Sequence, residues 1–298
     1  MYTNEQIRQL FGSDVLSYLA NKNRGGISGE KGNTYENFFA VYQLALLAKE
    51  VIENQRKINF YSQIIAFVDD LIIVCQDDIT VQHYQLKNRT DVAWGNGPQS
   101  ITDDFSKQYA LNQSMSRESK LHLIVSSQEL SVRLSESLPA AIKAYSQVLH
   151  FPYESSLVKV IAQQPDFREA IEYLCAFENP APDKIECVAA VLLGAWVSSD
   201  KSGVSVMEIL IKAQQSTPSF IRSFSQEWQL DPEVESILSK IEGLSYNLTK
   251  GFLHWEYGDG LDEGTLPYSI DSEKFRRFQA LLKRNNPTSF EELEAFLI

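Results

Sequence analysis

The residues that could do chemistry lie at one end of a predicted β-hairpin, opposite its turn. Two strand-like runs, DLIIVC and TVQHYQLK, flank the polar turn QDDI, whose centre follows Asp77. If the hairpin is symmetric about this point, Asp70 lies opposite Gln85, with Cβ atoms roughly 5 Å apart on one face. Lys87 follows two residues after Gln85 and shares that face. A carboxylate, an amide and an ammonium group are therefore predicted to meet, and a register slip of one residue would separate them.

These residue types suit the hydrolysis of a phosphodiester. Asp70 and the side-chain oxygen of Gln85 are hard ligands of the kind that Mg²⁺ prefers, and Mn²⁺ is a possible substitute. Lys87 could orient or deprotonate the attacking water, or stabilise charge in the transition state. Glu36 could add a second carboxylate if its helix packs across the sheet. Asp69 is an equally acidic neighbour and could take the ligand role of Asp70.

Each of these residues also has a structural interpretation. Glu36 lies three residues after Asn33 and could be a capping glutamate at a helix start. The two aspartates could merely end a strand, and Lys87 could be a solvated edge lysine. His83 is predicted on the same face, where a packed histidine is commoner than a ligand. The combination of these residues on one face favours the functional interpretation.

Three basic residues near the predicted site could contact the phosphates of DNA, because such contacts need positive charge and no base complementarity. They are Arg24, Lys31 and Arg89. The alternative for each is ordinary surface charge.

The elements that must position these residues are predicted by periodicity and turn signals. In the first half we expect helices over residues 4–20, 33–55 and 101–112, and strands over residues 59–67, 70–75, 80–87 and 120–127. After the first helix, the order is α-β-β-β-α-β. In the second half we expect only helices, over residues 140–150, 167–177, 183–198, 206–215, 232–244 and 272–283, with a last one that begins at residue 289. The fold class predicted is an α/β domain over residues 1–134, followed by an all-α domain over residues 135–298.

Charge supports a division into two domains. The 298 residues carry a formal net charge of −12, which taken alone speaks against a polyanion as partner. Residues 1–134 contribute −2 and residues 135–298 contribute −10, so DNA contacts are expected in the first part. The longest apolar run is too short to span a bilayer, and no signal peptide opens the sequence. We therefore expect a cytoplasmic protein that does not contact a membrane.

The order of elements, a helix glutamate, an aspartate that opens one strand and Q-x-K on the next together resemble the PD-(D/E)xK nuclease superfamily. Within it, the segments RGGISGEKGNTYENFFAVYQLALL, VDDLIIV and HYQLK are similar to the Cap-type double-strand DNA endonuclease domain of bacterial anti-phage systems. The resemblance covers about residues 24–130. It implies a restriction-endonuclease-like fold, with Glu36, Asp70, Gln85 and Lys87 at the metal and catalytic positions. Gln85 stands where many members have Glu or Asp.

The same resemblance implies how such an enzyme would be used. A nuclease that can damage its own host needs restraint by a partner, and the remaining 164 residues do not suit the usual nucleotide-sensing domain of Cap-type proteins. This favours a nuclease subunit held by a separate SMC-like ATPase, similar to Lamassu systems, with residues 135–298 serving oligomerisation or partner binding. We expect a homo-oligomer in the active state. Two alternatives stay open: a catalytically inactive nuclease-fold scaffold or DNA-binding subunit, and a protein-interaction adaptor whose helical half carries the function.

Overall fold

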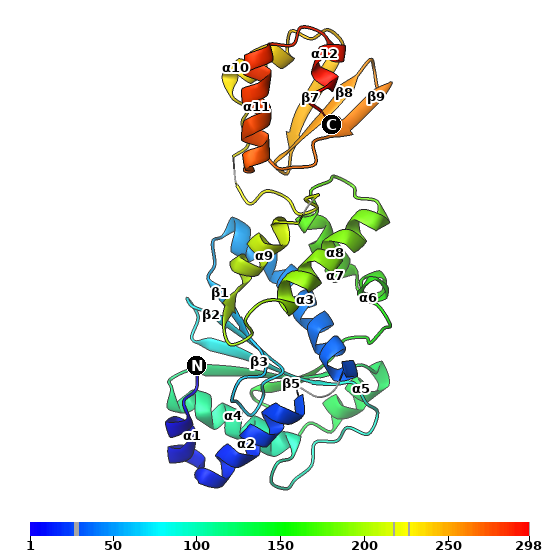
Figure 1. Cartoon of the computed structure of the whole chain (residues 1–298). Helices are drawn as coiled ribbons and strands as arrows, with labels where there is room; N and C mark the ends of the chain where they lie inside the picture. The colour runs from blue at the N-terminus through cyan, green and yellow to red at the C-terminus, as the bar shows by residue number, and fades with distance from the viewer. Residues whose placement is uncertain (27–29, 217, 226, 298) are drawn as a thin grey trace. The chain divides into compact units, whose positions relative to one another are not determined.

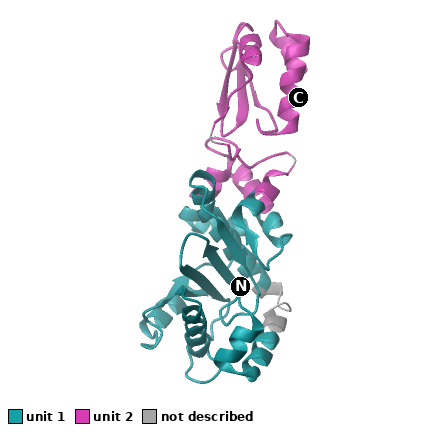
Figure 2. Cartoon of the chain, turned by 90° about the vertical axis from the view of Figure 1, so that its left-hand side faces the viewer, with its two compact units in different colours: residues 1–168, 192–210 teal, residues 169–191, 211–298 magenta. Residues whose placement is uncertain are grey.

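A computed structural model describes residues 1–26, 30–216, 218–225 and 227–297, and the side chains of these residues except 23–32. The chain forms two compact units (Figure 2). Unit 1 comprises residues 1–168 and 192–210, and unit 2 comprises residues 169–191 and 211–298. The division predicted after residue 134 is therefore not where the units separate, because β5 (Ser146–His150) pairs with β4 and extends the sheet of unit 1.

Unit 1 is built on a six-stranded mixed sheet in the order β5-β4-β3-β2-β1-β6 (Figure 1). Besides β5, its strands are β1 (Ile58–Tyr61), β2 (Leu71–Cys75), β3 (Thr80–Lys87), β4 (Glu118–Val125) and β6 (Val204–Ser205). The strands β6, β1, β2 and β3 pair antiparallel, whereas β3, β4 and β5 run parallel. The predicted α/β character of the N-terminal part is confirmed.

Helices cover both faces of this sheet (Figure 1). The helices wholly within unit 1 are α1 (Asn4–Phe11), α2 (Ser13–Gly26), α3 (Glu30–Glu53), α4 (Ile101–Ser114), α5 (Gln128–Glu136) and α6 (Leu157–Gln163). Three more, α7 (Pro165–Leu174), α8 (Pro182–Val197) and α9 (Val206–Gln214), each have residues in both units. Consecutive residues of β3 show which helix lies on which face. Tyr84 packs on Phe39 of α3, whereas His83 hydrogen-bonds to Asn112 of α4. The two helices therefore cover opposite faces.

The predicted hairpin has the predicted register. Leu71 pairs with Tyr84 and Ile72 with His83, which continues to Asp70 opposite Gln85. The order α3-β1-β2-β3-α4-β4 also matches the predicted α-β-β-β-α-β order. Two boundaries differ. The first strand ends at Tyr61 instead of residue 67, and Gly12, with φ +85°, separates the predicted first helix into α1 and α2.

The expectation that residues 135–298 are all helical is wrong. Of the predicted helix over residues 140–150, the last part is strand β5, which pairs parallel with β4. Unit 2 contains a second sheet, β7-β8-β9, formed by β7 (Leu244–Thr249), β8 (Phe252–Tyr257) and β9 (Asp262–Thr265). Lys250 and Gly251, with φ of +52° and +84°, form the turn that reverses the chain between β7 and β8. This turn lies between two predicted helices, in a segment for which no strand was predicted.

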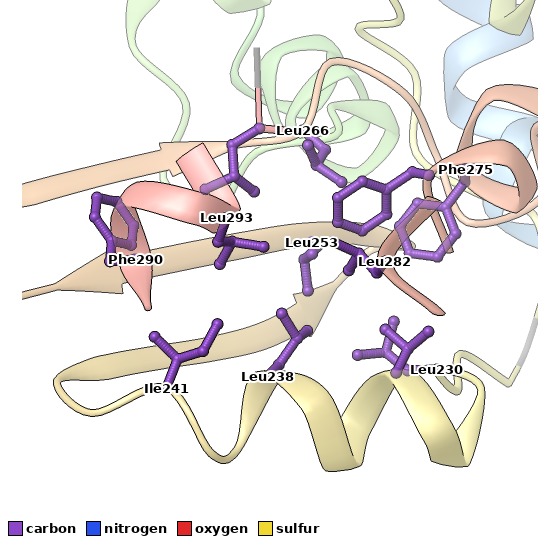
Figure 3. Packing of buried hydrophobic residues seen from close by; sticks show 12 residues of the cluster. Leu230, Leu238, Ile241, Leu253, Leu266, Phe275, Leu282, Phe290 and Leu293 are labelled. Atoms are coloured by element: carbon purple, nitrogen blue, oxygen red, sulfur yellow. The ribbon is translucent and has the colours of Figure 1, made fainter. Parts of the chain in front are cut away.

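The core of unit 2 lies between this sheet and three helices. They are α10 (Pro232–Leu238), α11 (Glu273–Asn285) and α12 (Phe290–Glu294). Figure 3 shows side chains from these helices and from β8 pointing toward one another, among them Leu238, Leu253, Phe275 and Leu293. Because alternate residues of β8 face this core, its other face carries His254 and Glu256 together with the buried Phe252. Among the described residues, no helix combines the length and apolar character needed to cross a membrane.

Candidate functional site

A pocket of about 180 Å³ in unit 1 gathers five of the residues selected from the sequence. It is lined by Lys22, Glu36, Gln63, Asp69, Asp70, Gln85, Leu86 and Lys87. The pocket lies where the N-terminal end of β2 meets the C-terminal end of β3, so the hairpin register decides its composition. The predicted convergence of Asp70, Gln85 and Lys87 is therefore seen in the structure, with Glu36 and Asp69 beside them.

Asp70 is fixed by its neighbours on the hairpin. Its Oδ2 accepts a hydrogen bond from the Gln85 amide Nε2 and another, of 2.6 Å, from the backbone N–H of Leu86. Its backbone carbonyl accepts a 2.8 Å hydrogen bond from the Ser62 hydroxyl. The carboxylate consequently has one orientation, with Oδ1 free of these bonds. The amide oxygen of Gln85 faces away from Asp70 and could serve as a metal ligand only after the amide turns over.

The loop that presents the two aspartates is held by buried polar side chains. Gln108 of α4 accepts a 3.0 Å hydrogen bond from the backbone N–H of Phe67. The Nδ1–H of His83 donates to the carbonyl of Val68 over 2.9 Å. His83 is fully buried, and burial lowers its pKa to about 4, so the ring is neutral near pH 7. It supports the loop and does not line the pocket.

Glu36 is not the capping residue that the sequence allowed. Helix α3 begins at Glu30, which places Glu36 beyond the first turn. Asn33 lies inside the helix, where its side chain accepts a 3.0 Å hydrogen bond from Asn37. The Glu36 carboxylate instead accepts a 3.3 Å hydrogen bond from Gln63 and lines the pocket.

Burial, with the neighbouring carboxylates as a smaller contribution, governs the electrostatics of the pocket. Burial, together with the negative charge of Asp70, raises the pKa of Glu36 to about 8. Burial also raises the pKa of Asp69 to about 7, and the attraction of Lys22 only partly opposes this shift. Both carboxylic acids therefore hold a proton far more tightly than exposed ones do. A second cation placed among them would favour the ionised forms.

Lys22 is the charged pocket residue that the sequence did not indicate. It comes from α2, and its Nζ donates to the backbone carbonyl of Phe67 and to Asp104 Oδ2, the latter over 2.8 Å. It also lies 3.8 Å from Asp69 Oδ1. Burial lowers the pKa of Lys22, but Asp69 and Asp104 outweigh burial, so the net shift is upward. A single lysine on a surface helix carries no sequence signal for these distant partners.

Of the three predicted DNA-contacting residues, the structure describes the side chain of Arg89, which does not line the pocket. Arg89 is exposed and its Nε lies 3.5 Å from Asp91 Oδ1. The side chains of Arg24 and Lys31 lie outside the described residues.

The donor set of the pocket fits a divalent cation in part. Among the described residues, no three His, Cys, Asp or Glu side chains are grouped closely enough to hold a metal ion by themselves. However, Asp69 Oδ1 is buried and has no hydrogen-bond partner. An ion such as Mg²⁺ keeps several waters and needs only one or two carboxylates. Asp69 and Asp70, with Glu36 nearby, meet that smaller requirement.

Comparisons with models of known protein families, with curated proteins and with solved structures gave no match. The class of the protein therefore follows from its own architecture: unit 1 is a mixed α/β domain with a polar pocket at one end of a β-hairpin.

Proposed function

We propose that the protein is a Mg²⁺-dependent DNA endonuclease, with Mn²⁺ as a possible substitute, whose active site is the pocket of unit 1. The observation that carries this proposal is the hairpin register, because it brings Asp70, Gln85 and Lys87 into a pocket shared with Glu36. These are the residues that the resemblance to PD-(D/E)xK nucleases selects. The arrangement of α3, the three antiparallel strands, α4 and β4 supports the same class.

The chain's own residues would divide the work as follows. Asp70, Asp69 and Glu36 would hold the cation, and Gln85 would join them once its amide oxygen turns inward. When bound, the cation would supply a more acidic water and neutralise charge on the phosphate. Lys87 would orient the attacking water and stabilise negative charge developing at phosphorus. Gln108 and His83 would keep the loop of the two aspartates in place.

The biological setting proposed here rests on the resemblance alone. The substrate would be double-stranded DNA, and the enzyme would act in the cytoplasm as an effector of anti-phage defence. An SMC-like ATPase or a similar partner would restrain it, and activation would involve a homo-oligomer. Unit 2, with its net negative charge, would supply the partner or oligomer contacts.

A plasmid-nicking assay with Mg²⁺ or Mn²⁺, and with EDTA as the negative control, tests the proposal. We expect cleavage by the wild type, and a loss of about 100-fold or more in Asp70→Asn and in Lys87→Met. Two matched controls change an exposed aspartate at the other end of the hairpin, Asp77→Asn, and an exposed lysine before β1, Lys57→Met. They should cleave like the wild type. Equal cleavage by all four variants would contradict the proposed site.

A restrained effector can be silent when purified alone, so the same variants are to be compared in cells. We expect overexpression of the full chain alone to be toxic, co-expression of its genomic neighbours to lower the toxicity, and Lys87→Met to abolish it at equal protein level. If toxicity persists in Lys87→Met, the proposed active site is wrong.

One observation favours a second function, a DNA-binding scaffold without catalysis. Gln85 carries no charge and donates its amide to Asp70, and the described residues offer no three-ligand acidic or histidine cage. Mobility-shift titration distinguishes the two functions. Tight, salt-dependent binding of duplex DNA without cleavage under any metal condition would support the scaffold.

A further inference from the structure

We infer that the ammonium group of Lys22 is a built-in cation of the candidate site, which partly balances Asp69 and opposes the binding of a divalent cation there. This inference rests on the proposed function, since it concerns the regulation of the same pocket. Lys22 belongs to α2, which precedes the α-β-β-β-α-β core, so a segment outside that core contributes a charge to the site.

The contacts of Lys22 place its charge between Asp104 and Asp69. An ammonium group has three N–H donors. One bonds to the carbonyl of Phe67 and one to Asp104 Oδ2, at 2.8 Å. Asp69 Oδ1 lies 3.8 Å away, which is close enough for an ion pair and too far for a hydrogen bond. Lys22 therefore attracts Asp69 without satisfying its buried oxygen.

The position of the ammonium is fixed by the packing of α2 on α4. Tyr18, one turn before Lys22, donates its hydroxyl to both oxygens of Asp104, at 3.1 and 2.9 Å. Asp104 is itself buried, and it binds both Tyr18 and Lys22, which lie four residues apart on one face of α2. The Lys22 side chain is 20% exposed, so it does not swing freely as a surface lysine does.

Two cations on one carboxylate repel each other. A divalent ion held by Asp69 would stand near the Lys22 ammonium, and the repulsion between a double and a single positive charge at about 6 Å, with an effective dielectric near 20, would weaken binding by up to about 10⁴-fold. The ion pair of Lys22 with Asp104, water in the pocket and rearrangement of the lysine all reduce this effect, so we expect about tenfold. Removal of the Lys22 charge should therefore tighten metal binding, whereas loss of a purely structural support should weaken it.

The test measures Mn²⁺ binding to the full chain by electron paramagnetic resonance titration, with no activity readout. Lys22→Met removes the charge, and Lys22→Gln removes it while keeping donors for Phe67 and Asp104, which favours a folded variant. Lys107→Met is the matched control. Lys107 is 24% exposed, pairs with Asp103 at 2.8 Å and lies 5.9 Å from the Phe67 ring, yet does not line the pocket.

We expect both Lys22 variants to bind Mn²⁺ about tenfold more tightly than the wild type, with Lys107→Met unchanged. We also expect a larger metal-induced rise in the thermal midpoint of the Lys22 variants. Affinity equal to or weaker than that of the wild type in Lys22→Gln would overturn the inference and leave the proposed nuclease standing. If neither the wild type nor any folded variant binds Mn²⁺, the proposed metal-dependent function fails, and the inference fails with it.

Discussion

The substitution Asp69→Asn tests the electrostatic account of the pocket without any assumption about catalysis. Asp69 is 5% exposed, and its pKa is raised from 3.8 to about 7, mainly by burial. A raised pKa means that the folded chain binds this proton more tightly than the unfolded chain does. Stability from this group is therefore complete below about pH 4 and is lost as the pH rises toward 7. Asparagine cannot ionise, so the variant lacks this loss.

The magnitude follows from the pKa difference. A shift from 3.8 to about 7 corresponds to about 4 kcal/mol in full, at 1.36 kcal/mol per pKa unit. Part of this loss of stability has already occurred at about pH 5, because the unfolded chain ionises from about pH 4 upward. The free energy of unfolding therefore falls by about 3 kcal/mol between about pH 5 and about pH 8. Glu36 also titrates in this range, and because the charge of Asp69 helps to raise its pKa to about 8, loss of that charge in the variant changes the difference in the same direction. The prediction therefore concerns the difference between the variant and the wild type.

Hydrogen exchange of peptides that cover β2 and β3 suits this measurement, because the chain has two compact units and global unfolding would mix them. In EDTA, we expect the opening free energy of the wild type to fall by about 3 kcal/mol more than that of Asp69→Asn between about pH 5 and about pH 8. Asp77→Asn, an exposed aspartate at the turn of the same hairpin, should show no such difference from the wild type. If the opening free energies of Asp69→Asn and the wild type change with pH in parallel, the reasoning is refuted. If the variant instead loses stability relative to the wild type at high pH, the attraction of Lys22 for Asp69 outweighs the cost of burial.

Two further substitutions test the supports of the site and of unit 2. Gln108→Leu removes the acceptor of the Phe67 N–H and should destabilise unit 1 by about 2 kcal/mol, with the fastest rise in hydrogen exchange at that loop; unchanged protection would contradict this role. Gly251→Ala should cost unit 2 about 2 kcal/mol or more in urea unfolding, since φ is +84° and the new Cβ would meet Ser223 Cβ at 2.2 Å; an unaltered midpoint would show that the turn can relax.

The part of the site that could be predicted from the sequence is the part that depends on local pattern. The two strands of the hairpin alternate regularly, and the polar turn between them fixes which residues are opposed. The pairing of Leu71 with Tyr84 confirms that register. Consequently the placement of Asp70 opposite Gln85 required only the position of one turn. Glu36 needed one further assumption, that its helix crosses the sheet, and the pocket shows that it does.

What could not be predicted depends on contacts between distant segments. Strand β5 has five residues with alternately exposed side chains, and its pairing with β4 is parallel, so no adjacent turn announces it. The helical interpretation of residues 140–150 failed for that reason. The second sheet was missed for a different reason: β7 alternates apolar and polar residues and ends at the turn of Lys250 and Gly251, but the helical patterns around it outweighed this strand signal. Lys22 could be assigned to the site only after α2 was seen to pack on α4.

The pocket combines features that stability alone would not favour. Glu36, Asp69 and Asp70 place three carboxylates around about 180 Å³, and the raised pKa values of the first two show that their ionisation costs the folded chain free energy. Lys22 and Lys87 line the same space, yet the buried Oδ1 of Asp69 still has no hydrogen-bond partner. A buried polar cluster kept only for packing would be expected to satisfy its own members. The raised pKa values and the buried oxygen without a partner support the proposed cation site, which is why metal affinity is a more direct test of the proposal than catalysis.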